Sequence, residues 1–451
     1  MVPAHPNGPV GIPLIGPVVE LGRDPLAFLE RVSAKYGDVV RFREGPTRWV
    51  TLFNHPDHIE QILVQHHKKL HKDRITQKMR RSLGNGLVTS EGAHWRRQRK
   101  LASPAFTRTQ IALYGDQMVR QAADAIDTWE QDQVRDVHRD MCLLTMDVIS
   151  TVLFSSGATV EVQEVVGEAL DTILTEFDID IHTWRLLLPD WVPTAGRRRT
   201  AAATRRLTGV LDALIIQGRA RETPAADLLG RLLEVRDEDG EGMSDDELRE
   251  ELLTLFVAGY ETTALTLFYS LHLLGQRPEA GERARAEIDE VLGSRLATVD
   301  DLPELRWTRA VIEESMRLLP PVWIIGREAI EPMEVGGVQI QPGDQLLISQ
   351  WVVHKDPRWW ENPRAFRPER WLDPAERARF AYMPFGGGPR VCIGNHFAMM
   401  EAVLLLATLL QRVRHIPEES GDPSLTPSIT LRPTSHKRMQ VQHRQATLVS
   451  G

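Results

Sequence analysis

The stretch FGGGPRVCIG, residues 385–394, determines how this chain is interpreted. Cys392 lies in a glycine-rich loop, and an apolar helical pattern begins just after it, at about Asn395. The free N–H groups and the positive dipole end of a helix N-terminus lower the pKa of a cysteine thiol, and glycines let the backbone approach a bulky planar ligand. A structural turn around a buried cysteine is the alternative. By themselves these residues leave redox, metal-binding and structural roles for Cys392 open.

The composition is that of a globular chain with a sizeable core. Hydrophobic residues make up 42% of the 451 residues and charged residues make up 26%. A net charge of −8 argues against nucleic acid as the main partner. Cys142 and Cys392 are the two cysteines of the sequence, which excludes a disulfide framework and suits a reducing compartment. Because Cys142 lies in an apolar run, we expect it to be a core thiol.

The sequence is expected to form one cytoplasmic domain. Residues 1–22 are rich in proline and glycine and lack a basic stretch followed by an apolar one, so we expect no targeting segment and no membrane anchor. The window from Leu252 to Gly275 has about the length of a membrane span, but Glu261 near its centre favours a buried helix. With no internal repeat or low-complexity linker, residues 23–445 are predicted to be a single domain.

Helical patterns dominate the sequence. Ser244 to Glu247 forms a capping box, which predicts a helix of about 30 residues that ends at Gly275 and is long enough to cross a domain. Other helices are expected at 25–36, through most of 56–299, and at 305–318 and 395–412, with short strands at 39–53, 322–349 and 423–442. Residues 361–385 are proline-rich and irregular, a long meander that needs anchors of its own.

The motif AGYETT, residues 258–263, places a carboxylate and hydroxyls in the middle of the long apolar helix. Such groups are costly inside an apolar helix unless each has a partner. A hydrogen bond from Thr262 back to a carbonyl of its own helix is the usual structural role. Because Gly259 thins the helix, a ligand that approaches here would disturb that bond. Glu261 and Thr262 would then form a proton-delivery pair.

Three further patterns are rich in charge. Glu314 and Arg317 lie one turn apart on one helix face, by default a weak surface pair. In the meander, an arginine of FRPERW, residues 366–371, would dock on a buried carboxylate. Trp95 and Arg99 share a helix face, so their N–H groups would both meet an anionic group, although a solvated basic helix is the alternative.

Together and in this order, the motifs resemble those of the cytochrome P450 family. The resemblance rests on W-x-x-x-R at 95–99, A-G-x-E-T at 258–262, E-x-x-R at 314–317, P-E-R at 368–370 and F-x-x-G-x-R-x-C-x-G at 385–394. It extends from about Gly11 to about Gln442, nearly the whole chain. It implies a mainly α fold with small β-sheets (α+β class), a long central helix and a bound haem b.

The resemblance also implies roles for individual residues. Cys392 would be the axial thiolate ligand of the haem iron, Phe385 would shield the sulfur, and Gly388 and Gly394 would let the loop approach the ring. The haem propionates would be bound by Trp95, Arg99, Arg327 and Arg390. The meander would be locked by a buried ion triad of Glu314, Arg317 and Arg370.

The implied function is haem-dependent monooxygenation, the insertion of one atom of dioxygen into an organic substrate, with protons relayed by Glu261 and Thr262. The residues expected near the substrate are uniformly apolar, which favours a lipophilic compound such as a terpene, fatty acid, steroid or macrolide-like molecule. They are Val257, Ala258, Val322, Trp323, Ile324, Ile325 and Ile429.

Electrons are expected from a separate protein. No G-x-G-x-x-G unit follows a strand and no flavin module is attached, so a ferredoxin or flavodoxin with its NAD(P)H reductase would supply them. The basic cluster of Arg96, Arg97 and Lys100 would dock such an acidic partner, and the enzyme itself is expected to be a monomer. Two alternatives remain: a peroxide-using haem-thiolate peroxygenase, which usually lacks the acid–alcohol pair, and a non-enzymatic haem sensor, which needs no proton relay.

Overall fold

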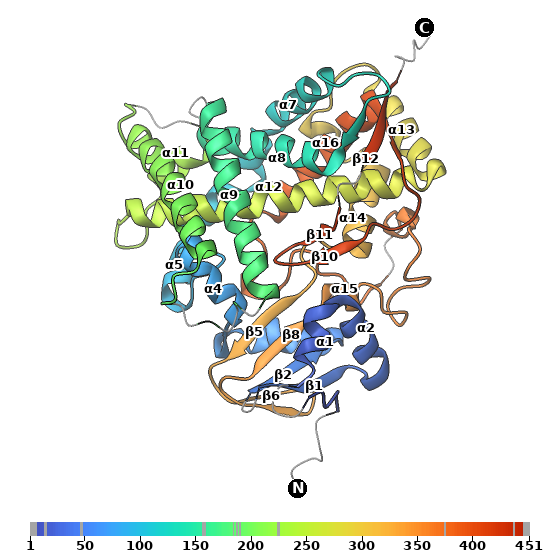
Figure 1. Cartoon of the computed structure of the whole chain (residues 1–451). Coiled ribbons are helices and arrows are strands. Elements are labelled where there is room, and N and C mark those ends of the chain that lie inside the picture. The colour runs from blue at the N-terminus through green and yellow to red at the C-terminus, as the bar shows by residue number, and fades with distance from the viewer. Residues whose placement is uncertain are drawn as a thin grey trace.

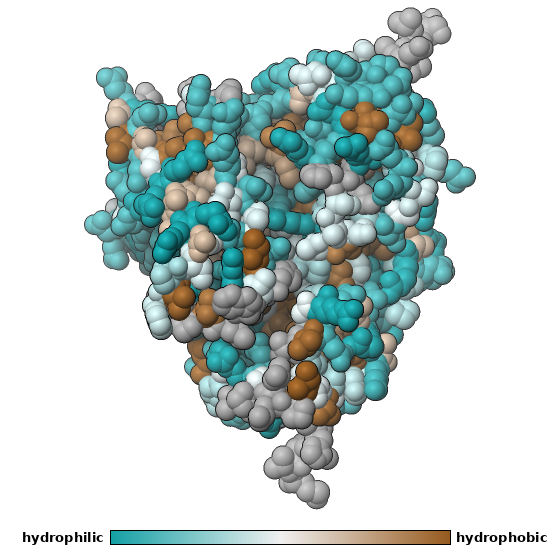
Figure 2. Space-filling view, in the orientation of Figure 1, coloured by the Kyte–Doolittle hydropathy of each residue, from teal (hydrophilic) through white to brown (hydrophobic). Residues whose placement is uncertain are grey.

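The computed structural model describes residues 7–12, 16–45, 48–155, 159–183, 185, 188, 191–222, 226–373, 376–435 and 438–444. Figure 1 shows a helical part, crossed from side to side by one long helix, and a smaller part built around a β-sheet. The visible face is mostly hydrophilic, with hydrophobic residues in small groups (Figure 2). This matches the expected mainly α fold with small β-sheets.

The helices of the described residues occur along almost the whole chain. They are α1 (Val18–Arg23), α2 (Pro25–Tyr36), α3 (Pro56–Glu60), α4 (Arg74–Leu83), α5 (Gly92–Ala102), α6 (Arg108–Ala112), α7 (Gly115–Asp127), α8 (Val137–Phe154), α9 (Val160–His182), α10 (Ala195–Arg219), α11 (Leu228–Glu234), α12 (Asp245–Gly275), α13 (Pro278–Leu292), α14 (Arg306–Leu318), α15 (Gln350–Val353) and α16 (Asn395–Arg412).

The strands form small sheets. The largest has the order β1-β2-β8-β5-β3, from β1 (Val39–Glu44), β2 (Arg48–Phe53), β8 (Gln345–Ile348), β5 (Ile325–Ala329) and β3 (Leu70–Lys72). The others are β4 (Val134–Asp136) with β12 (Arg438–His443) and β9 (Val413–Pro417), the pair β6 (Met333–Val335) and β7 (Val338–Ile340), and the pair β10 (Leu425–Pro427) and β11 (Leu431–Pro433).

The long helix α12 is the centre of the core. It begins at the expected capping box, in which the Glu247 N–H donates to the Ser244 hydroxyl at 3.2 Å and the Ser244 N–H donates to the Glu247 carboxylate at 2.9 Å. By length and composition α12 would be able to cross a membrane, but 72% of its apolar window is buried inside the fold. A buried core helix can have the length and composition of a membrane span, and the sequence predicts a buried helix here.

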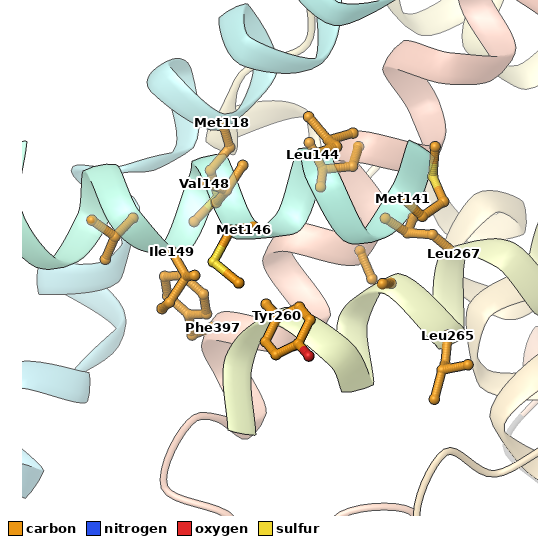
Figure 3. Packing of buried hydrophobic residues seen from close by; sticks show 14 of the residues in the cluster. Met118, Met141, Leu144, Met146, Val148, Ile149, Tyr260, Leu265, Leu267 and Phe397 are labelled. Atoms are coloured by element: carbon orange, nitrogen blue, oxygen red, sulfur yellow. The ribbon is translucent and has the colours of Figure 1, made fainter. Parts of the chain in front are cut away.

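Helix α8 packs closely on α12 around Gly259. A Cβ at this position would lie 3.1 Å from Cδ1 of Ile149, and Figure 3 shows Ile149 on the side of α8 that faces α12. The hydroxyl of Thr145 on α8 also donates to the carbonyl of Tyr260 at 2.7 Å. Gly259 therefore serves the contact between two helices.

Most expected elements are present, and the differences are short strands. Helix α2 begins at Pro25, with Asp24 accepting from the Ala27 N–H at 3.0 Å, and α16 spans the expected 395–412. The residues that join β1 to β2 lie partly outside the described residues. Strands β3 and β4 interrupt a region expected to be helical. Each strand has only three residues and forms because a distant strand pairs with it. The local sequence therefore shows no alternation of apolar and polar residues that would predict either strand.

Candidate active site

The loop before α16 requires glycine at position 388. Gly388 has a φ of +68°, and a Cβ there would lie 1.9 Å from the carbonyl oxygen of Leu63. The Cys392 N–H donates to the carbonyl of Phe385 at 3.0 Å, which closes the loop. The loop thereby holds Cys392 just before the N-terminus of α16.

The Cys392 side chain is exposed, although protein atoms surround it on most sides. Burial raises the pKa of the Cys392 thiol and outweighs the Gly394 N–H and the Arg99 guanidinium, which both lower it. The expected lowering of this pKa is therefore wrong for the thiol alone, because desolvation disfavours the charge more than one N–H group and one cation favour it. A metal ion bound to the sulfur would reverse that balance, since a coordinating thiol is deprotonated.

One face of α12 is uncovered near the middle of the helix. Between Glu251 and Leu274 every residue is buried except Ala258, which is exposed, and Val257, Gly259 and Thr262, which are half-buried. An exposed alanine in the centre of a buried helix means that no side chain of the fold covers this face. We call this space the α12 opening.

The acid and the alcohol of the expected pair both have protein partners. The Thr262 hydroxyl donates to the carbonyl of Ala258 at 2.7 Å, the usual bond of a threonine within a helix. The Glu261 side chain is buried, with 4% of the residue exposed, and its Oε1 accepts from Nε of Arg432 at 2.5 Å. Glu261 is therefore directed at the β10–β11 hairpin.

A cluster of cations lies near the loop of Cys392. Arg390 donates to the carbonyl of Ser90 at 3.0 Å, forms an ion pair with Glu91, and stacks on Trp95, with its Cζ 4.3 Å from the ring centroid. Arg327 is buried and donates to the carbonyl of Gly326 at 2.7 Å.

The cluster carries more positive than negative charge. Burial and the fields of Arg327 and Arg390 lower the pKa of Lys72 to about 7, against the weaker effects of Asp73 and Glu91. Burial lowers the pKa of Arg327 to about 10, and Arg390 adds to this effect. These lowered pKa values indicate that nearby carboxylates do not fully neutralise the positive charges of Lys72 and Arg327. The cluster would therefore bind a further anion strongly.

The expected ion triad is assembled in the fold. Arg317 donates twice to the Glu314 carboxylate, at 2.9 and 2.8 Å, and Arg370 donates to it at 3.0 Å. The side chains of Glu314 and Arg317 are fully buried, and that of Arg370 is 10% exposed. Arg317 also donates to the carbonyls of Pro363 and Ala365, at 2.6 and 3.1 Å, and so fastens the meander to α14.

Comparison with known families decides the identity. The cytochrome P450 family model matches residues 6–440. The chain belongs to the cytochrome P450 family.

The P450 is similar to enzymes of Streptomyces. It is 37% identical over 441 residues to cyclooctatin synthase of Streptomyces melanosporofaciens, covering 95% of this chain and 94% of that protein. It is 38% identical over 416 residues to cyclooctat-9-en-7-ol 5-monooxygenase of the same organism, covering 91% and 89%. Among solved structures, the haem domain of cytochrome P450DA matches with a TM-score of 0.86 and 25% identity, over 98% of both chains. This chain is accordingly a cytochrome P450 monooxygenase.

P450 enzymes use haem with a cysteine thiolate ligand, and the residues present fit this group. Cys392 is an exposed residue, and a Cβ at Gly394 would meet no protein atom within 4 Å. The α12 opening leaves Ala258 uncovered. The cation cluster has the surplus charge that two propionates would neutralise. When bound, the haem supplies the activation of dioxygen, with electrons delivered by a redox partner.

The residues expected near the substrate differ in how deeply they are buried in the P450 fold. Val257, Val322, Ile324, Ile325 and Ile429 are half-buried and Ala258 is exposed. Cδ1 of Ile325 lies 3.6 Å from where a Cβ of Gly386 would be, so Ile325 adjoins the cysteine loop. Trp323 is 7% exposed, donates from its indole to the carbonyl of Ser428 at 2.8 Å and packs in the core near β1 and β2, so we do not include it among the lining residues.

Sequence reasoning missed three residues of this P450. Arg432 pairs with Glu261, Lys72 belongs to the cation cluster, and the Trp371 indole donates to the Glu314 carboxylate at 2.9 Å. Trp371 follows the P-E-R motif directly and was available as a candidate. Neither Arg432 nor Lys72 has any regular spacing from its partners in the sequence.

Proposed function

We propose that this P450 monooxygenase hydroxylates or epoxidises a terpene. The observation that carries the proposal is the apolar character of the residues expected near the substrate, of which Ala258 is exposed on α12 and Val257, Ile325 and Ile429 are half-buried. An apolar lining favours a hydrocarbon skeleton over a charged substrate, because a charge would lose its hydration without a partner. Among lipophilic classes, the names of the relatives favour a terpene: one acts on cyclooctat-9-en-7-ol, and another, 33% identical over 428 residues, is a pentalenene oxygenase.

The roles that we propose for the chain's residues divide into binding and proton movement. Cys392 would ligate the haem iron, Phe385 would shield the sulfur, and Gly394 would leave room for the ring. The propionates would be bound by Trp95, Arg99, Arg327 and Arg390, joined by Lys72. Glu261 and Thr262 would pass protons toward the opening, and the triad of Glu314, Arg317 and Arg370 would have a structural role.

P450 monooxygenases need a redox partner, and we propose an acidic ferredoxin or flavodoxin in the cytoplasm. The expected docking cluster on α5 is partly used within the fold. Arg97 donates to Asp237 at 2.8 Å and to Glu247 at 2.7 Å, and Lys100 pairs with Glu238. Arg96 is exposed and has no ionic partner among the described residues. Arg96 is therefore the cation on which we base the docking proposal.

A substrate screen tests the proposed function. The haem-loaded P450 would be titrated with terpene hydrocarbons and terpene alcohols, and with fatty acids, steroids and macrolides of matched size, while the haem absorbance is followed. We expect terpenes to give the tightest spectral shift. With a surrogate ferredoxin, its reductase and NADPH, we then expect a product that has gained one oxygen atom. Tighter binding and faster turnover of a fatty acid or steroid would contradict the terpene assignment.

Two controls separate this function from its alternatives. Cys392→Ala should abolish the red-shifted absorbance band of the reduced, carbon monoxide-bound protein, and survival of that band would refute Cys392 as ligand. Turnover with hydrogen peroxide but not with NADPH and the surrogate partners would instead identify a peroxygenase. Specific spectral shifts without any oxygenated product under either condition would favour a haem sensor.

A further inference from the structure

Glu261 is held by a residue from the far end of the chain. Nε of Arg432 donates to Oε1 of Glu261 at 2.5 Å, across 171 positions of sequence. The Glu261 side chain is 5% exposed and that of Arg432 is 22% exposed, so most of the pair is removed from water. In such surroundings a carboxylate without its cation is strongly disfavoured. Arg432 is therefore the group that determines where the Glu261 carboxylate points.

The hairpin that carries Arg432 is fastened on two sides. Its connecting residues 428–430 lie between β10 and β11, alongside α12 (Figure 1). The Tyr269 hydroxyl on α12 donates to the carbonyl of Leu431 at 2.6 Å. The Leu431 N–H donates to the carbonyl of Pro321 at 2.9 Å, next to Val322. A displacement of this turn therefore acts directly on α12 and on the segment that enters β5.

The same hairpin also carries Ile429, one of the residues expected near the substrate. Ile429 is half-buried, whereas Ser428 and Thr430 on either side are 8% and 5% exposed. Ile429 packs against the same hydrophobic cluster as Val257 of α12. Ile429 and Arg432 are three residues apart, so a molecule that displaces Ile429 displaces the backbone that positions Arg432.

The charges around the pair reinforce it. Glu261 raises the pKa of Arg432 above its usual value despite burial, with smaller contributions from Tyr260 on α12 and Asp178 on α9. Burial raises the pKa of Tyr260, and Glu261 adds to that effect. On α8, burial raises the pKa of Cys142. Tyr260 and Cys142 are therefore neutral at physiological pH, and Arg432 is the cation that meets Glu261.

We propose that Arg432 is a positioning residue for Glu261, which links occupancy of the α12 opening at Ile429 to proton delivery on α12. The inference rests on the proposed function, because it concerns the same acid–alcohol pair. While Arg432 holds it, the Glu261 carboxylate stays directed at the hairpin. When the hairpin shifts, Glu261 takes up one proton from hydronium of the bulk solvent and passes it to the Thr262 hydroxyl, which gives up its own proton toward the opening. The net result is one proton moved from the solvent to the opening, and Glu261 and Thr262 end in the states in which they began.

The first test measures this link without turnover. Amide hydrogen exchange of the haem-loaded enzyme would be recorded with and without clotrimazole, a bulky azole that ligates haem iron and fills the space above it. In the native enzyme we expect the azole to change exchange in both residues 425–433 and residues 258–263. In Arg432→Met the azole-induced change in exchange at 258–263 should disappear, while the change at 425–433 remains. Arg432→Lys should restore part of the change at 258–263. An unaltered response at 258–263 in Arg432→Met would overturn the proposal.

The second test measures proton delivery. Without substrate, Arg432→Met should raise peroxide formation from NADPH and dioxygen roughly fivefold, because Glu261 is then no longer held. Adding Glu261→Gln to Arg432→Met should remove that increase. Arg414→Met breaks an exposed pair with Glu282 and should leave peroxide formation at the native rate. A lower melting temperature in Arg432→Met with native peroxide formation would mean that Arg432 is only structural.

The two proposals fail in distinguishable ways. If no terpene is oxygenated, the proposed function fails, but the exchange response to clotrimazole still reports whether Arg432 links the hairpin to α12. If terpenes are oxygenated and that response is the same in Arg432→Met as in the native enzyme, the function stands and the link is refuted.

Discussion

Single side chains in this P450 owe their chemistry to burial more than to their neighbours in sequence. Glu401 on α16 is 1% exposed, and its carboxyl accepts from the Thr263 hydroxyl at 3.1 Å. Burial raises the pKa of Glu401 to about 8, and the Thr263 bond only partly opposes this. The group is therefore mostly neutral at pH 7, although glutamate is ionised at this pH in an unfolded chain.

Replacing Glu401 should change the pH dependence of stability. Because the folded-state pKa is raised, the native carboxyl contributes most below about pH 4.5, and the free energy of unfolding falls as pH rises toward 8. Glu401→Gln cannot ionise, so we expect it to be more stable than the native protein by on the order of 4 kcal/mol at pH 8, and about equally stable at pH 4.5.

Chemical denaturation at a series of pH values measures this difference. Glu304→Gln provides a matched control, because Glu304 is exposed and the same substitution there should leave the profile unchanged. A constant difference between Glu401→Gln and the native protein at all pH values would contradict a raised pKa for Glu401.

At the scale of elements, the cysteine loop depends on a close backbone contact. The positive φ of Gly388 and the approach of its Cα to Leu63 allow the loop to lie against the turn after α3. The loop then presents Cys392 before α16. The position of the sulfur is therefore determined by a contact more than 300 residues away in sequence.

Gly388→Ala should weaken this element. The added methyl would lie 1.9 Å from a backbone oxygen and would also require an unfavourable φ, so we expect a loss of at least about 2 kcal/mol in the free energy of unfolding. Reduced retention of haem should accompany the loss. Urea denaturation and the haem-to-protein absorbance ratio measure the two effects.

Gly209→Ala is the control for the same chemical change. Gly209 lies inside α10, where an added Cβ would meet no atom within 4 Å. Alanine favours a helix over glycine by up to about 1 kcal/mol, so this variant should be slightly more stable than the native protein. Similar losses in both variants would refute the steric argument for Gly388.

At the scale of the whole molecule, the charge distribution determines where an acidic redox partner can bind. The net charge is −8, so a positive docking surface has to be local. Of the basic cluster on α5, Arg97 and Lys100 already have carboxylate partners. The attraction to an acidic partner would therefore come mostly from Arg96.

Arg96→Gln should slow reduction of the enzyme by an acidic surrogate ferredoxin. At low ionic strength we expect the second-order rate constant to fall roughly threefold, and the difference should vanish in high salt because exposed charges are screened. Stopped-flow reduction measures both. Arg414→Gln removes another exposed arginine, on β9, and should have no effect. Reduction rates independent of ionic strength would refute electrostatic docking.

The sequence by itself determined the features that depend on local spacing. The capping box of α12, the pair of Glu314 and Arg317 one turn apart, and the start of α16 after Cys392 all follow from residues within four positions of one another. The order of the motifs also sufficed to indicate the family, because each motif is short and contiguous.

Only the tertiary structure decided the properties that depend on distant contacts and on burial. The pair of Glu261 and Arg432 joins residues 171 positions apart, and no period in the sequence relates them. Lys72 belongs to the cation cluster because β3 pairs with β5, which carries Arg327. The direction of the Cys392 pKa shift follows from desolvation, which is set by all the atoms packed around the sulfur. A local pattern determines which groups are present, and the fold determines their partners and their charge.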